Sequence, residues 1–377
     1  MPLTRRQFLV AATAAAAALS PRLRLLAEQP ALDVYRRAVV IEGLGGPGGM
    51  GVDWGNPLTA AQIEDVRQSG LTATHITVGY VGSQPSLQAF EIIMRSIAFW
   101  EHEIDTWPNV LTHVRVAGDF RRAKSSGMTG LLYGLQDGVS FQDDLDRLEV
   151  LYQFGVRIIQ PTYNRRNLLG DGCMEPADAG LSRAGHESIT RLNELGILVD
   201  LSHCGRRTTA DAIASSTMPV SFTHTGCAAL EDHPRHRTDE EMRRVADGGG
   251  VTGIYVMPYL AGGRQPTAAD VIAHLEHAVN VAGEDHVGIG TDGYVSPTVL
   301  TDEYRAKFAE NIRERRESGI AAPGETEKGY LFASDLNTPR RLETLAGLLL
   351  KRGHSETRVE KILGGNFERL FDTVWAE

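Results

Sequence analysis

Polar side chains stand directly after three short apolar runs of the sequence, at His203, His224 and Asp292. Imidazole and carboxylate groups are common ligands of zinc and similar divalent ions, and a carboxylate can also accept the proton of an attacking water. A lone histidine in such a place is more often a hydrogen-bonded core residue, but two on neighbouring strand ends about 4.8 Å apart can share one ion. We therefore predict a metal site on His203 and His224, with Asp292 as a further metal ligand or as the general base.

Two residues, Asp292 and Arg235, are open to more than one interpretation. Asp292 could instead cap the N-terminus of a helix, since the turn-forming Gly293 follows it. Arg235 lies in a loop shortly after His224, and its two-pronged guanidinium could hold the carboxylate of a substrate. A solvated surface arginine is equally common, so the residues alone leave the role of Arg235 open.

The elements that must position these residues alternate between short apolar runs and longer amphipathic stretches. The expected strands are 38–42, 73–78, 130–135, 157–162, 198–202, 220–223, 251–256 and 287–290. The expected helices include 145–154, 186–195, 239–246, 268–282, 303–317, 339–352 and 356–370. Strict alternation implies parallel pairing, and eight repeats predict a closed (β/α)8 TIM barrel with its active site at the C-terminal strand ends. A doubly wound open sheet is the competing fold, but no Gly-x-Gly-x-x-Gly motif follows the first strand.

The last three helical stretches follow the eighth strand, and we expect them to pack on the outside of the barrel. No linker, repeat or charged tail marks a second domain, so residues 28–377 are expected to form one domain. The chain of 377 residues is 42% hydrophobic and 23% charged, which supplies a large core. Its net charge of −10 argues against a nucleic-acid partner.

The three cysteines, Cys173, Cys204 and Cys227, do not form a disulfide scaffold, and their odd number leaves at least one thiol unpaired within a monomer. Cys204 and Cys227 stand close to the two histidines in the sequence. They could be ligands, a disulfide or plain small apolar residues.

Residues 1–27 are typical of an export signal. Arg5 and Arg6 precede Phe8, Leu9 and an alanine-rich apolar run that is too short for a membrane span. This is the twin-arginine pattern, which predicts passage of the folded protein through the twin-arginine translocase into the periplasm. An alanine-rich first helix of the mature protein is the alternative.

Several segments in order along the chain resemble the membrane (renal) dipeptidase family. They are 148–173, 193–203, 222–224, 274–292 and 361–367, within a match that spans about residues 37–375. The resemblance implies a two-zinc barrel that cleaves dipeptides, including dehydropeptides and some that contain D-residues, through a bridging water. It also implies that His203 and His224 bind the second metal and that Asp292 is the catalytic and first-metal aspartate. Arg235 would bind the substrate carboxylate, and Tyr163 stands where the family usually has a substrate-contacting histidine.

The sequence departs from this family at its first metal. The family's His-x-Asp pair falls on Leu44 and Gly46, and its bridging glutamate falls on Gln136, a neutral amide left here as a substrate-contacting residue. Asp137 points to the opposite face of its strand and cannot replace its neighbour, and Glu42 is a remote substitute. We therefore predict zero to one ion per chain, zinc or another divalent metal.

Three functions remain open from the sequence. The first is a dipeptidase-like hydrolase that acts on small peptides or peptide-like amides with at most one metal ion. The second is a periplasmic, non-hydrolytic enzyme that matures a siderophore or another peptide product, with Cys204, Cys227, Tyr163 and Asp292 as candidate groups. The third is a catalytically silent binding protein. A homodimer is compatible with each.

Overall fold

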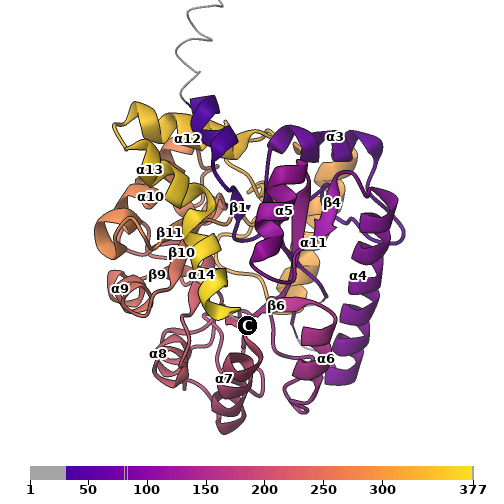
Figure 1. Cartoon of the computed structure of the whole chain (residues 1–377). Helices are drawn as coiled ribbons and strands as arrows, with labels where there is room; N and C mark the ends of the chain where they lie inside the picture. The colour runs from indigo at the N-terminus through magenta and orange to yellow at the C-terminus, as the bar shows by residue number, and fades with distance from the viewer. Residues whose placement is uncertain (1–30, 80, 83, 376–377) are drawn as a thin grey trace, which may run out of the picture.

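The computed structural model describes residues 31–79, 81–82 and 84–375 (Figure 1), so the predicted signal at residues 1–27 lies outside the described residues. At its centre lie eight short parallel strands: β1 (Ile41–Glu42), β3 (Ala73–Thr77), β5 (Thr129–Leu135), β6 (Val156–Ile159), β7 (Leu198–Val199), β8 (Ser221–Cys227), β10 (Val251–Ile254) and β11 (Val287–Ile289). β1 pairs with β3 and with β11, and a parallel bridge between Asp200 and Ser221 joins the end of β7 to the start of β8. The strands thus form a ring, which confirms the barrel fold, and each expected strand overlaps one of them.

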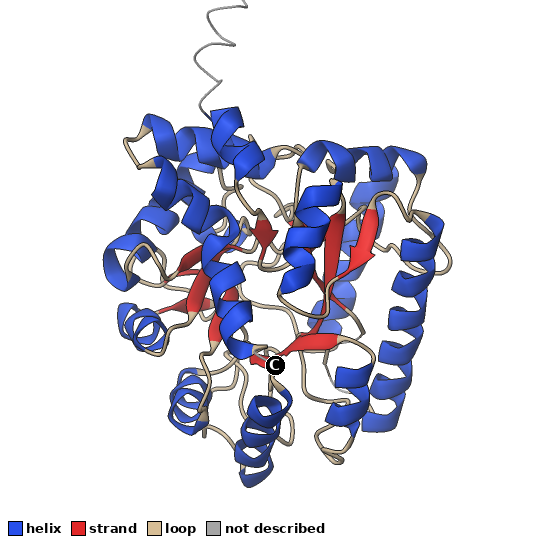
Figure 2. Cartoon of the chain, in the orientation of Figure 1, coloured by secondary structure: helices blue, strands red, loops and turns tan. Residues whose placement is uncertain are grey.

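Helices surround the ring of strands (Figure 2). They are α3 (Ala60–Ser69), α4 (Ser86–Thr106), α5 (Gly118–Ser126), α6 (Arg147–Gln153), α7 (Arg183–Leu195), α8 (Arg206–Ser215), α9 (Asp239–Asp247), α10 (Ala268–Ala282), α11 (Asp302–Glu317), α12 (Arg341–Lys351), α13 (Glu356–Glu360) and α14 (Asn366–Val374). Because helices cover the strands from outside, β5 is buried at all seven residues and reads as a continuous apolar run. Local signals set the helix ends: Thr238 closes a capping box at the start of α9, and Gly196 ends α7 in the left-handed conformation.

The last predicted helix differs from expectation in two ways. A π-helical segment at Lys361–Gly365, with a non-helical Gly364, separates α13 from α14. The side chain of Phe367 lies against the positions of Gly43, Gly253 and Gly288, on the inner side of the barrel. Phe367, Phe371 and Trp375 form one cluster with residues at the starts of several strands. α14 therefore closes the N-terminal end of the barrel, so the prediction that it packs only on the outside was wrong.

Short additional strands extend the barrel near its C-terminal end. β2 (Gly45–Gly46) pairs with β12 (Gly293–Tyr294). β9 (His236–Arg237) pairs in parallel with the end of β8. These pairs fix the loops that carry Asp292 and Arg235. None of the helices within the described ranges is long and apolar enough to cross a membrane.

Candidate active site

A cavity of about 680 Å³ opens where the barrel strands end. Five of the predicted site residues line it: Gln136, Tyr163, His203, Arg235 and Asp292. They follow β5, β6, β7, β8 and β11, so the barrel brings together side chains that are far apart in the sequence. The sixth, His224, is completely buried within β8 and contacts His203 at the edge of the cavity.

The two histidines face each other through their Nε2 atoms, which are 3.1 Å apart. The Nδ1–H of His203 donates to Asn164 Oδ1 at 2.6 Å, and the amide orientation of Asn164 is set because its Nδ2 donates to a backbone carbonyl. The Nδ1–H of His224 donates to Thr223 Oγ1 at 2.8 Å, since the hydroxyl proton of Thr223 is already given to Asp200. Both Nε2 atoms therefore carry lone pairs that point toward each other.

Two facing lone pairs repel unless a cation lies between them. Burial, followed by the nearby charge of Arg235, holds the pKa of both histidines well below the usual range, so a shared proton is not the stable solution near neutral pH. Two nitrogens bound to one tetrahedral zinc at about 2.0–2.1 Å stand about 3.3 Å apart, close to the observed separation. The pair is thus a suitable half-site for a divalent ion.

Asp200 supports this pair from inside the barrel. Its carboxylate is fully buried and accepts hydrogen bonds from the backbone and hydroxyl groups of Ser202 and Thr223. Its Oδ2 lies 4.0 Å from His224 Nδ1. The negative charge and the Thr223 bridge both favour a cation on the far nitrogen of His224.

Asp292 sits in a turn between β11 and β12 with φ of 54°, a left-handed conformation that only Asp178 shares among the described non-glycine residues. Its backbone N–H donates to Leu44 O at 2.9 Å. Burial raises the pKa of its carboxyl to about 6, although Arg235 and Arg315 act in the opposite direction. No described residue donates a hydrogen bond to this carboxylate, which lines the cavity. The helix-cap alternative was wrong, because Thr301 caps the next helix, α11.

Arg235 is 2% exposed and is not a surface arginine. Its guanidinium donates to Ser202 O and lies 3.5 Å from His224 O, the backbone of the two strands that carry the histidines. No carboxylate of the described residues forms an ion pair with it. A buried cation without a counter-charge is unfavourable, so this end of the cavity is suited to an anionic group.

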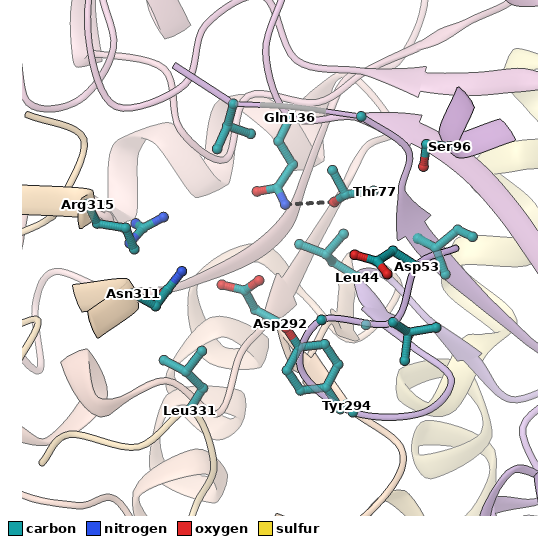
Figure 3. A pocket seen from close by; sticks show the side chains of 18 of the residues that line it. Leu44, Asp53, Thr77, Ser96, Gln136, Asp292, Tyr294, Asn311, Arg315 and Leu331 are labelled. Carbon is teal, nitrogen blue, oxygen red and sulfur yellow. Dashed lines mark hydrogen bonds between the residues drawn. The ribbon is translucent and has the colours of Figure 1, made fainter. Parts of the chain in front are cut away.

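Gln136 and Tyr163 complete the wall around the histidines. Gln136 Nε2 donates to Thr77 Oγ1 at 2.7 Å (Figure 3), which leaves its amide oxygen without a protein partner among the described residues. The ring of Tyr163 stacks on His203 with centroids 4.0 Å apart, and Arg315 donates to its hydroxyl at 3.2 Å. Both positions allow contact with a bound substrate.

The segment after β1 contributes Leu44 and Gly46 to the cavity, and neither side chain can bind a metal. The Glu42 carboxylate instead accepts hydrogen bonds from Thr74 and Thr291. In the described parts of the chain, no three histidine, cysteine or carboxylate groups are arranged to hold one ion. The predicted number of metal ions remains a prediction.

Two residues of the site, Asn164 and Arg315, were not predicted from the sequence. Asn164 orients His203 and also donates to Ile320 O at 2.7 Å, so it ties the histidine to the segment after α11. Arg315 of α11 lines the cavity and forms a two-point ion pair with Glu325. Asn164 lies within the segment 148–173 that carries the resemblance, but no local pattern indicates that α11 returns to the barrel mouth.

The cysteines have no visible role in this chemistry. Cys204 and Cys227 are completely buried, and burial raises the pKa of each thiol to about 12. All three described cysteines are free, so the disulfide interpretation was wrong. Cys204 and Cys227 therefore fit the interpretation that they are small buried apolar residues.

Comparison with known proteins places this chain in a family. The model of the membrane dipeptidases, peptidase family M19, matches residues 49–309. The chain belongs to this family. The crystal structure of an amidohydrolase from Pseudomonas aeruginosa is 32% identical, covers 92% of this chain and 99% of its own, and superposes with a TM-score of 0.78.

Other similar proteins share a smaller fraction of identical residues with this chain. The dipeptidase verJ of Clonostachys rogersoniana is 27% identical over 76% of this chain, and the match spans 66% of that relative's length. A metallopeptidase from Rhodobacter sphaeroides, solved with a phosphinate mimic of L-Ala-D-Ala, is 17% identical with a TM-score of 0.71 over 90% of this chain and 99% of its own. The probable dipeptidase PvdM of Pseudomonas aeruginosa is 19% identical with a TM-score of 0.75 over 94% and 99%. The last two likenesses concern the fold alone.

Proposed function

We propose that this chain is a metal-dependent hydrolase that cleaves the amide bond of dipeptides or similar small amides at the barrel mouth. The observation that carries the proposal is the convergence of the His203 and His224 lone pairs at 3.1 Å. Beside them lie the buried Arg235 and the partly buried Asp292, and neither forms an ion pair with another described residue. Membership of the membrane dipeptidase family and the names of the relatives support the same function.

Each residue has a distinct task in this proposal. Arg235 binds the carboxylate of the substrate and thereby places the scissile amide beside the histidines. Asp292 accepts the proton of the attacking water and later gives it to the departing amine. Tyr163 and Gln136 contact the substrate from the cavity wall. A divalent ion on His203 and His224 would polarise the amide carbonyl and lower the pKa of water.

The metal number is part of the same proposal: zero to one divalent ion, preferably zinc, held through His203 and His224. Tight binding requires a third protein ligand, because zinc in proteins is usually held by at least three. Asp292 is the candidate for this third ligand, because its carboxylate is a suitable metal ligand whereas Leu44, Gly46 and Gln136 offer no charged donor.

The test combines metal analysis with substrate hydrolysis. Protein purified without chelator and equilibrated with micromolar zinc is analysed for bound metal and for release of amino acids from a panel of dipeptides. His203→Ala should lose both the metal and the hydrolysis, whereas His277→Ala, at a histidine on α10 paired with Asp239, should keep both. Two tightly bound ions per chain would overturn the predicted metal number. Failure to cleave any dipeptide in the zinc-loaded wild type would overturn the function.

A further inference from the structure

One end of the cavity is largely apolar and lies away from Arg235 and Arg315. We call this end the apolar arm, and it is lined by Val52, Ile76, Ile92, Phe99 and Trp100. Ile92, Phe99 and Trp100 belong to helix α4. Figure 3 shows Ser96, which also belongs to α4, on the opposite side of the cavity from Arg315 and Asn311 of α11. The cavity therefore extends from α11 to α4, with Asp292 and Gln136 between them.

The arm is a rigid part of the core. Ile76, Phe99 and Trp100 are 2%, 3% and 8% exposed, and all three belong to the main hydrophobic cluster. Phe99 packs edge-on against Trp100 at 5.1 Å and against Trp54 at 5.5 Å. Ile92, Ser96 and Phe99 recur at the spacing of one helix face, so α4 presents a continuous surface to the cavity.

Charge is distributed unequally between the two ends. The charged side chains of Arg235 and Arg315 lie near His203, at the histidine end. At the arm, the charged lining residues are Asp53 and Arg95, which are both exposed. Asp53 Oδ1 accepts hydrogen bonds from Gly55 and Asn56, and Arg95 pairs with Glu91. Among the described residues, no buried charge therefore faces the arm.

A dipeptide of two small residues would leave this arm filled with water against apolar walls. Removing apolar surface from water is favourable by about 25 cal/mol per Å², and burying one large aliphatic side chain contributes about 1.5–3 kcal/mol. A cavity of about 680 Å³ also lies in the range that encloses ligands larger than the smallest dipeptides. The arm thus has both the volume and the surface for a bulky apolar group.

We propose that the apolar arm binds a large apolar side chain on the amino-terminal residue of the substrate. The inference rests on the proposed function, in which Arg235 holds the carboxylate of the carboxy-terminal residue. With that carboxylate at the histidine end, the amino-terminal residue lies on the other side of the scissile amide, toward α4. The preferred substrate class is therefore a dipeptide whose first residue is large and apolar.

The first experiment compares three dipeptides on the zinc-loaded protein. The value of kcat/KM for L-Leu-L-Ala should exceed the values for L-Ala-L-Ala and L-Ala-L-Leu by at least about tenfold, since burial of the leucine side chain contributes about 1.5–3 kcal/mol. Equal values for all three, or a preference for L-Ala-L-Leu, would overturn the proposed arm.

The second experiment fills the arm. Ser96→Phe places a ring in the cavity from the half-buried face of α4, whereas Ala98→Phe places the same ring on the exposed face of that helix. Ser96→Phe should lower kcat/KM for L-Leu-L-Ala to that of L-Ala-L-Ala, with L-Ala-L-Ala itself unchanged within about twofold. Ala98→Phe should behave as wild type. An equal loss on both substrates from Ser96→Phe would contradict the inference.

A binding measurement separates this inference from the proposed function. If the wild type cleaves none of the dipeptides, the function fails, and L-Leu-L-Ala becomes a stable probe for calorimetric titration. Ser96→Phe should then weaken its binding at least about tenfold relative to Ala98→Phe. Equal affinities in the two variants, or no binding to the wild type, would overturn the arm as well.

Discussion

Arg235, which is 2% exposed, and Asp292, which is partly buried, line one cavity, and neither forms an ion pair with another described residue. Such groups cost stability in the folded state, because desolvation is not offset by a partner. Natural proteins retain unfavourable groups of this kind mainly where a ligand or a reaction uses them. At the scale of single residues, the site is therefore distinguished by two charged side chains that lack an oppositely charged partner.

The first prediction concerns Asp292→Asn. Activity should fall at least about 100-fold, the usual contribution of a positioned acid or base. Wild-type activity should also decline as the pH falls through about 6, where the carboxylate that accepts the proton becomes protonated. A pH profile of kcat/KM checks both expectations, and activity that stays constant down to pH 5 would exclude Asp292 as the base.

The same substitution should affect stability in the opposite direction. The folded-state pKa is raised from 3.8 to about 6, so ionised Asp292 destabilises the fold by up to about 3 kcal/mol above pH 6 and by little below pH 4. Metal-free Asp292→Asn should thus melt above metal-free wild type at pH 8, and this difference should vanish near pH 4.

The second prediction concerns Asp200→Asn, which keeps the size of the side chain but removes the charge behind His224. Zinc affinity, measured by competition with a chelator, should fall about 10–100-fold, as is usual for groups that orient metal-binding histidines. Asp137→Asn is the matched control, because Asp137 is also a buried carboxylate but bonds to Gly82 and Asn167 instead. Equal zinc affinity in both variants would make Asp200 a purely structural residue.

The residues found from the sequence share a local signal. His203, His224 and Asp292 each follow an apolar run, and in a parallel barrel that position lies at the mouth. Asn164 and Arg315 carry no such signal, since their importance depends on contacts with His203 and Tyr163 that only the folded chain creates. The sequence therefore predicts residues that meet at the barrel mouth, but it does not reveal the residues that orient them.

At the scale of elements, the strands were predictable because burial on both faces makes them uniformly apolar. The ends of the strands were less predictable. β7 covers Leu198–Val199, whereas the apolar pattern in the sequence extends to residue 202. The chain turns after Asp200, which places His203 in the cavity. The helix expected at 356–370 is interrupted at Lys361–Gly365. Helical periodicity does not reveal where Phe367 must leave the outer layer to enter the barrel.

The third prediction tests this element. Phe367→Ala should lower the free energy of unfolding by about 3–5 kcal/mol, the usual cost of truncating a buried phenylalanine, because it empties the barrel floor. Denaturant unfolding measures the change, and Phe154→Ala, at a phenylalanine that is 48% exposed, is the control. A loss below about 1 kcal/mol in Phe367→Ala would show that α14 does not seal the core.

At the scale of the whole molecule, the closed ring followed from counting eight alternating repeats, and the family from motifs spread along the chain. The single domain over residues 28–377 and the export signal remain predictions. We propose that the protein acts in the periplasm after passage through the twin-arginine translocase. This rests on Arg5 and Arg6 before the apolar run at the start of the chain.

The fourth prediction tests this location. Replacing Arg5 and Arg6 together by lysine should leave the full-length precursor in the cytoplasm, because the translocase reads the arginine pair and not positive charge alone. Fractionation of cells and immunoblotting measure the distribution of precursor and mature protein. Export of the lysine form at the wild-type level would show that export does not depend on the arginine pair, which would contradict the twin-arginine prediction.

The position of α14 has a consequence for how the protein is made. All eight strands leave the ribosome before α14, yet its aromatic side chains complete their common interior. At about 5–20 residues per second, the 77 residues between Ile289 and Asn366 take about 4–15 s to synthesise. During that interval the nascent barrel exposes an unsealed apolar floor, a surface that chaperones bind. The barrel interior of this family member is thus completed only after α14 has been synthesised.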